Sequence, residues 1–157
     1  GQLNLSADKV FSKYGLINSF ESRLKFVNGN ILFDQFLLNF GKLGAADITG
    51  IIENENKFTN FKFENNIFLD NLKRFYSKFG IYNKKSISSN IFISGNLDLD
   101  NFKIFFHEIS DDQKFSDEEI NYIQKEFNDL LLEDGYLTFF DYLKLKEFVK
   151  LILTDTN

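Results

Sequence analysis

The chain of 157 residues contains no cysteine, proline, methionine or tryptophan. Without cysteine there is no disulfide framework, no thiolate nucleophile and no cysteine-based zinc site. Without proline nothing forces a break in a helix, which favours a mostly helical chain. Together with abundant Asn, Lys, Ile and Phe, these absences indicate an AT-rich coding sequence rather than a particular function.

Long apolar runs and an excess of positive charge are also missing. No run approaches the ~18 residues of a membrane span and no signal peptide opens the chain, so we expect a soluble, cytoplasmic protein. The net charge of −5 at pH 7 disfavours nucleic-acid binding, which needs a basic face. The same charge suits a basic partner helix and also ordinary solubility. A leading glycine in place of Met indicates a tag remnant or an excised fragment.

What the chain does contain is phenylalanine, 21 residues of it, and a recurring eight-residue pattern. Each copy begins with a residue that tolerates positive φ and places Ile or Leu two positions later. An amide or carboxylate then precedes an aromatic residue or Leu that opens a helical apolar pattern. The intervals between copies are typical of helical repeat units. The copies lie at 29–36, 65–72, 95–102 and 135–142.

Apolar residues at i, i+3, i+4 and i+7 follow each copy and predict a helix with one buried face. Gly41 and Gly80 are suited to end the first two of these helices. Another helix is predicted from Ser116, because Glu119 completes a capping box. The helices expected after the copies cover 33–41, about 69–80, 102–109 and 142–152, and shorter patterns lie at 6–14, 47–52 and 85–92.

A polar segment at 81–89, rich in Asn, Ser and Lys, separates the second copy from the third. It predicts a hinge between two halves of similar length. We therefore expect an all-α protein of two lobes, with an N-terminal lobe at 1–80, a linker at 81–89 and a C-terminal lobe at 90–157. Each lobe would pair two helix–loop–helix units.

The four copies resemble the second half of an EF-hand, and over about 7–153 the chain resembles the calmodulin superfamily. Among its members the chain is most similar to a myosin light chain. The resemblance implies two EF-hands per lobe, joined by a short β bridge between their loops. It implies that Ile31 pairs with Ile67 and that Leu97 pairs with Leu137.

The first half of each loop has lost its calcium ligands. Calcium takes about six to eight oxygens, yet Phe26, Lys62 and Phe92 stand at ligand positions, and no copy keeps the closing Glu. We therefore expect no cofactor and no calcium. A weak cation site at Asn128, Asp134 and Asp141 stays open as a candidate, although Asp134 followed by glycine also suits a tight turn.

The residues show no catalytic constellation. No nucleophile motif, phosphate-binding glycine loop or zinc spacing is present, and the lone His107 is best explained as a surface or interface histidine. We therefore expect that the protein is not an enzyme.

The resemblance implies a calcium-independent light chain that clamps the basic, IQ-type helix of an unconventional myosin in association with the cytoskeleton. The alternatives are a calmodulin-like or centrin-like scaffold domain of a larger cytoskeletal or membrane-associated protein, a calcium sensor, and a helical domain of unknown role. The candidates for the partner-binding groove are Phe36, Phe40, Phe75, Phe79, Phe102, Phe106, Phe127, Tyr142 and Phe148.

Overall fold

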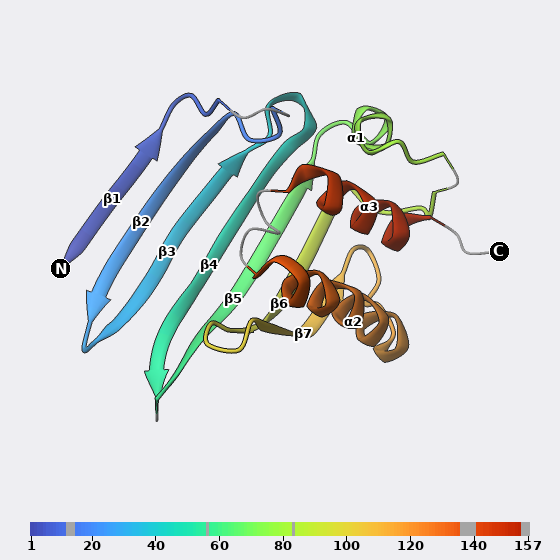
Figure 1. The fold of residues 1–157 in the computed structure, drawn as a ribbon. Coiled ribbons are helices and arrows are strands. Elements are labelled where there is room, and N and C mark those ends of the chain that lie inside the picture. Colours follow the sequence, from blue (N-terminus) through green and yellow to red (C-terminus); the bar gives the residue numbers. More distant parts are fainter. Residues whose placement is uncertain (12–14, 56, 83, 136–140, 155–157) are drawn as a thin grey trace.

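The computed structural model describes residues 1–11, 15–55, 57–82, 84–135 and 141–154. Within them, seven antiparallel strands form one sheet in which every strand lies beside its neighbour in the sequence (Figure 1). One helix lies in the connection between the fifth and sixth strands, and two more follow the last strand. The elements are β1 (Gln2–Ala7), β2 (Ser19–Val27), β3 (Asn30–Asn39), a short 3-10 helix (Gly41–Leu43), β4 (Gly44–Glu55), β5 (Phe58–Leu69), α1 (Leu72–Phe79), β6 (Asn90–Asp98), β7 (Lys103–Ser110), α2 (Asp117–Asp134) and α3 (Tyr142–Leu153).

The sheet has one apolar face and one polar face. On β5, Phe61, Phe63 and Ile67 pack toward the helices, while Lys62 and Glu64 alternate with them and are exposed. Successive side chains of a strand point to opposite faces, so this alternation separates core from solvent. The register carries the same division across all seven strands, because directly opposite residues share a face.

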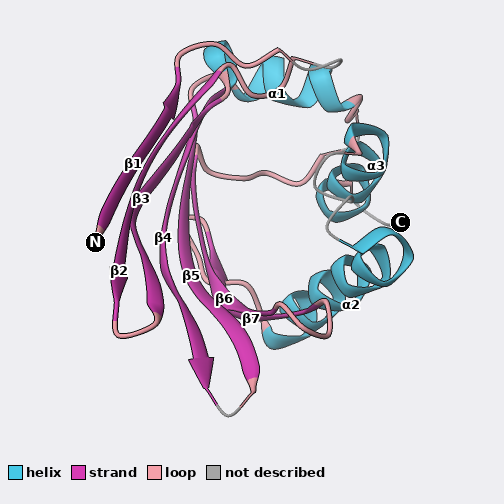
Figure 2. Ribbon diagram, turned by 60° about the vertical axis from the view of Figure 1, so that its left-hand side comes forward, coloured by secondary structure: helices cyan, strands magenta, loops and turns pink. Residues whose placement is uncertain are grey.

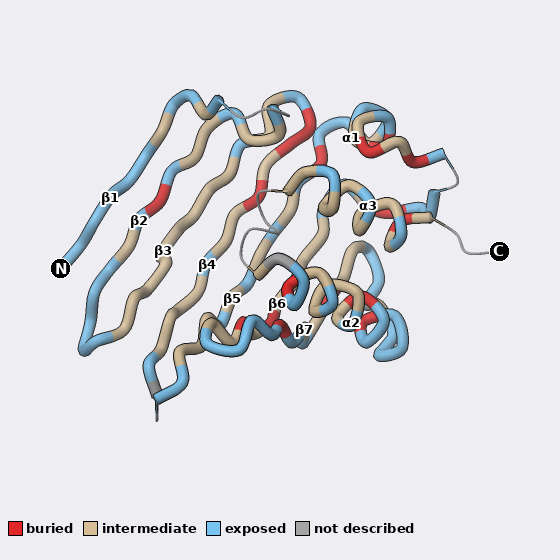
Figure 3. Tube along the Cα trace, viewed as in Figure 1, coloured by how far each residue is buried: buried red, intermediate tan, exposed pale blue. Residues whose placement is uncertain are grey.

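All three helices lie on the apolar side of the sheet (Figure 2). They cover β5 to β7, and the buried residues gather there and at the adjoining end of β4 (Figure 3). The apolar face continues over β1 to β3 beyond the helices, where Leu3, Leu5 and Phe26 are each more than 40% exposed. The core is therefore concentrated in the C-terminal half of the sheet.

Helix α2 closes the outer edge of β7 with side chains instead of another strand. Asn128 Oδ1 accepts a hydrogen bond of 2.7 Å from the Ile104 N–H, and Asn128 Nδ2 donates one of 3.0 Å to the Ile104 carbonyl. One helical turn earlier, Gln124 Oε1 accepts from the Phe106 N–H at 2.9 Å. An edge strand otherwise leaves such groups unpaired, so the two amides protect this edge of the sheet.

The all-α prediction is wrong. The segment 33–41 lies mostly in β3, 47–52 in β4 and 102–109 mostly in β7. Neither 6–14 nor 85–92 contains a helix in its described residues. An apolar set at i, i+3 and i+5 fits one face of a strand with a β-bulge, because the extra residue shifts the alternation by one. In β3 a bulge between Phe33 and Phe36 places Phe33, Phe36 and Leu38 on one face.

The EF-hand resemblance is also wrong, since its first three copies adopt unrelated structures; most of the fourth, at 135–142, lies outside the described residues. The copy at 29–36 contains a hairpin turn and most of it lies in β3, while 65–72 ends β5 and begins α1. The copy at 95–102 ends β6 and forms the turn after it. In place of the implied bridges, Ile31 lies opposite Ile52 and Ile67 lies opposite Ala46 and Ile91.

The last implied bridge joined Leu97 to Leu137. Leu97 lies opposite Phe61 and Ile104, and Leu137 falls outside the described residues. The strands that flank the segment 81–89, β5 and β6, pair with each other in the sheet. The strands before and after this segment therefore belong to one sheet.

Three predicted helices and one predicted helix end are confirmed, because α1 lies within the predicted range of about 69–80 and α2 and α3 match two other predicted helices. Helix α2 begins after Ser116, whose Oγ accepts from the Glu119 N–H at 3.2 Å, while Glu119 Oε2 accepts from the Ser116 N–H at 2.9 Å. The hydrogen bonds that the Glu119 carboxylate accepts from the backbone N–H and the Oγ of Ser116 lower the pKa of this carboxyl from its ordinary value. Helix α3 spans the predicted apolar stripe, and Gly80 ends α1 with a φ of 65°. No helix of the described residues is long and apolar enough to cross a membrane.

Candidate binding site

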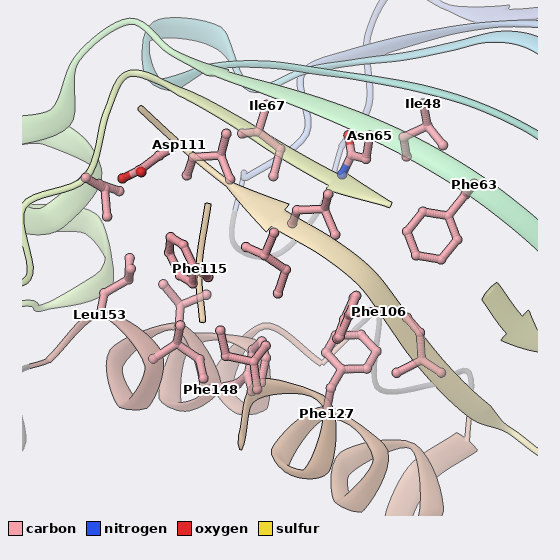
Figure 4. A pocket seen from close by; sticks show the side chains of 18 of the residues that line it. Ile48, Phe63, Asn65, Ile67, Phe106, Asp111, Phe115, Phe127, Phe148 and Leu153 are labelled. Carbon is pink, nitrogen blue, oxygen red and sulfur yellow. The ribbon is translucent and has the colours of Figure 1, made fainter. Parts of the chain in front are cut away.

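A cavity of about 380 Å³ lies between the apolar face of the sheet and the helices (Figure 4). Its walls come from β4 to β7, from all three helices and from the loops beside them. Representative lining residues are Ile48 of β4, Phe63 of β5, Phe106 of β7, Phe127 of α2 and Phe148 of α3. Apolar side chains therefore converge on one space from elements that are far apart in the sequence.

An aromatic contact series joins the helices to the sheet at this cavity. The Phe106 and Phe127 rings lie 5.9 Å apart, edge to face, and Phe127 meets Phe148 in the same way at 5.2 Å. Such geometry adds roughly 0.5–1.5 kcal/mol per pair beyond area burial. Phe127 of α2 thus contacts both β7 and α3, so it holds the two helices and the strand together at the cavity.

One polar side chain, Asn65, sits in the sheet wall of the cavity beside Ile48 (Figure 4). It faces the helices because it lies two residues from Phe63 and two from Ile67 along β5, on the same face of the strand. Its Oδ1 atom is buried and has no hydrogen-bond partner among the described residues. Leaving such a buried acceptor unpaired costs about 1–3 kcal/mol, so Asn65 lowers the stability of the sheet wall.

The other polar lining residue described is Asp111, in the loop after β7. Its Oδ2 accepts from the Ser88 N–H at 3.3 Å and its Oδ1 from the Gln113 N–H at 3.0 Å. These bonds tie the segment before β6 to the segment before α2. A smaller hollow of about 190 Å³, which we call the vestibule, lies at this end and is lined in part by Lys85 and Lys114.

The size of the cavity has an energetic consequence. Apolar side chains that face this space lack packing partners on that side and lose dispersion contacts. A ligand that fills the space restores those contacts and, because it binds only the folded state, stabilises that state.

The volume also bounds the occupant. If a methylene group takes about as much room as a water molecule in the liquid, about 30 Å³, then 380 Å³ holds about a dozen carbons. This is the size of one medium-length acyl chain. Ligand pockets in proteins commonly span about 300–1,000 Å³, so the cavity lies within the ordinary range.

The aromatic residues predicted to form a partner-binding groove are divided between several places. Phe75, Phe106, Phe127 and Phe148 line the cavity. Their binding of a partner helix stays a prediction. The others do not line it: Phe79 is buried against Tyr142, Phe36 packs on Phe20 and Phe33, Phe40 precedes the 3-10 helix, and Phe102 is exposed in the turn after β6.

The residues of the weak cation candidate have structural roles elsewhere. Asn128 binds the edge of β7, and Asp141 begins α3 by accepting from the Leu143 and Lys144 N–H groups at 3.1 and 3.2 Å. Asp134 is the last residue of α2. Where the chain is described, no three His, Cys, Asp or Glu side chains cluster as a metal site. His107 is exposed on β7, outside the cavity.

The sheet side of the cavity was missed by the sequence prediction. Phe61, Phe63, Asn65 and Ile67 alternate with polar residues, and that period of two is the signal of a half-buried strand. The chain matches no protein-family model, and no curated protein or solved structure is significantly similar to it. The cavity itself is therefore the feature from which a function can be inferred.

Proposed function

We propose that this domain binds an apolar ligand of the lipid class, with a single acyl chain held in the cavity between the sheet and the helices. The observation that carries the proposal is a 380 Å³ space lined almost wholly by apolar side chains. Burial of about a dozen methylene groups at about 0.8 kcal/mol each supplies roughly 10 kcal/mol before the costs of association. Affinities in the micromolar range are expected.

The chemistry of the lining supports binding rather than catalysis. Asn65 and Asp111 are the polar residues among its described members. Asp111 uses both carboxylate oxygens to hold backbone N–H groups, and the Asn65 amide is not a nucleophile or a proton-transfer group. The cavity thus offers shape and apolar contact to a ligand.

Titration with 1-dodecanol, an uncharged twelve-carbon chain, tests this proposal. The protein is first unfolded in denaturant, stripped of co-purified lipid and refolded. Calorimetry is then expected to show that each protein molecule binds one molecule of 1-dodecanol with a micromolar Kd. At 100 times Kd, binding stabilises the folded state by about 2.7 kcal/mol. For a chain of 157 residues this corresponds to a rise in Tm of about 5–10 °C. Refolded protein that shows no saturable binding and no shift in Tm would sink the proposal.

A further inference from the structure

The vestibule adjoins the cavity, because the two share Ile87, Asp111, Phe115, Ile152 and Leu153 as lining residues. The shared residues come from the segment before β6, the loop between β7 and α2, and the end of α3. Beyond them the vestibule is lined by polar and charged side chains. The cavity is therefore bordered at this end by a polar compartment.

One wall of the vestibule is fixed by hydrogen bonds to the backbone of Lys85. The Lys85 N–H donates to the Leu153 carbonyl at 2.9 Å, and the Tyr76 O–H donates to the Lys85 carbonyl at 2.9 Å. The neighbouring Ile87 is buried in the core. The Lys85 side chain is exposed and thus extends from an anchored position.

The opposite wall is the loop between β7 and α2, which carries Lys114. A β-bridge pairs Lys114 with Ser110, and the next residue, Phe115, donates its N–H to the Ile109 carbonyl at 2.9 Å. This folds the loop back on the end of β7. Lys114 and Lys85 therefore lie on two anchored segments that border the same hollow.

The carboxylates of the vestibule are already engaged, while its ammonium groups are not. Asp111 accepts from two backbone N–H groups, and Glu119 accepts from the N–H and Oγ of Ser116. Lys85 and Glu119 attract each other electrostatically, but neither Lys85 nor Lys114 forms an ion pair with any described residue. Ammonium groups are donors only, so the partner that the vestibule lacks is an acceptor.

We propose that the vestibule binds the anionic head group, carboxylate or phosphate, of a single-chain amphiphile whose tail fills the cavity. This inference rests on the proposed function and adds the class of ligand to it. Lys85 and Lys114 contact the head group, and Ile87, Phe115 and Leu153 surround the first carbons of the tail. The ammonium groups remain near water, so each charge contributes modestly and the two together confer about tenfold selectivity.

The test compares laurate, dodecyl phosphate and 1-dodecanol on the wild-type chain and on K85A/K114A, at constant ionic strength. The wild-type chain is expected to bind at least one of the anions about tenfold tighter than the alcohol. K85A/K114A should lose that preference and keep its affinity for the alcohol. K42A/K73A is the matched control: it removes the same charge from two exposed lysines outside the vestibule and should behave as wild type.

The outcomes separate this inference from the function on which it rests. Preference for laurate over dodecyl phosphate identifies a carboxylate head group, the reverse preference identifies a phosphate monoester, and either supports the inference. Equal affinity for all three ligands overturns it and leaves the proposed function standing. Equal losses of anion affinity in K85A/K114A and in K42A/K73A also overturn the inference, because they show that anion binding depends only on the net charge of the protein. Failure of dodecanol to bind refutes the proposed function itself.

Discussion

Replacement of Asn65 by phenylalanine is expected to raise the free energy of unfolding by about 1–3 kcal/mol and to weaken dodecanol binding at least tenfold. The buried Oδ1 of Asn65 has no partner among the described residues, so its removal ends a desolvation cost. The new ring occupies part of a 380 Å³ space that is otherwise empty without ligand. Chemical denaturation of ligand-free protein measures the first effect, and calorimetric titration measures the second.

The neighbouring residue provides a matched control for this substitution. Asn66 is the same amino acid on the same strand, but it is exposed on the opposite face of the sheet. N66F should change stability by no more than about 0.5 kcal/mol and leave binding unchanged. If N65F instead destabilised the protein by about 1–3 kcal/mol, as overpacking of a filled core does, the cavity would not exist in solution.

Replacement of Asn128 by alanine is expected to lower the free energy of unfolding by about 3 kcal/mol. The substitution removes both hydrogen bonds to Ile104, whose side chain is buried, and leaves one N–H and one carbonyl of the β7 edge unpaired. For this chain length Tm should fall by about 6–12 °C. The exposed edge is also a template for strand pairing, so self-association should rise in sedimentation measurements.

Two further variants distinguish the loss of the edge contact from a change in helix propensity as the cause of a change in stability. Asn121 lies on the same helix and is exposed, so N121A makes the same chemical change without an edge contact and should cost little. N128D keeps the acceptor for the Ile104 N–H but turns a carboxylate oxygen toward the Ile104 carbonyl. It should therefore destabilise the fold at least as much as N128A. Similar stabilities for N121A and N128A would show that α2 does not protect the edge.

The elements that the sequence predicted correctly are those with local signals. Ser116 and Glu119 form a capping box within one helical turn, and Gly80 ends α1 through its own positive φ. Such signals depend on neighbours in the sequence and not on tertiary packing. They identified the start of α2 and the end of α1 even though the fold class was wrong.

The strands were missed because apolar spacing was weighed more heavily than residue type. In 102–109 the apolar set Phe102, Phe105, Phe106 and Ile109 suggested a helix, whereas Ile104, Phe106 and Ile109 face the core across a bulge. Isoleucine and phenylalanine favour strands, and this preference argued against the helix that the apolar spacing suggested. The bulge is set by pairing with β6, which the sequence of β7 alone does not reveal.

The cavity was beyond sequence prediction for a different reason. Phe106 and Phe127 were named as groove residues, and they do meet across an interface between β7 and α2. The space beside them depends on the distance between a sheet and a helix layer that are joined by long-range contacts. No periodicity within one element encodes that distance.

The most direct test of the account is to locate the bound chain by nuclear Overhauser effects from uniformly ¹³C-labelled 1-dodecanol to protein methyl groups. The account predicts contacts in one complex to Ile93 on β6, Ile123 on α2 and Val149 on α3, which line the cavity from opposite sides. Contacts confined to Leu3 and Leu5, on the exposed apolar face of β1, would contradict it. They would show that the ligand adheres to the uncovered sheet and leaves the cavity empty.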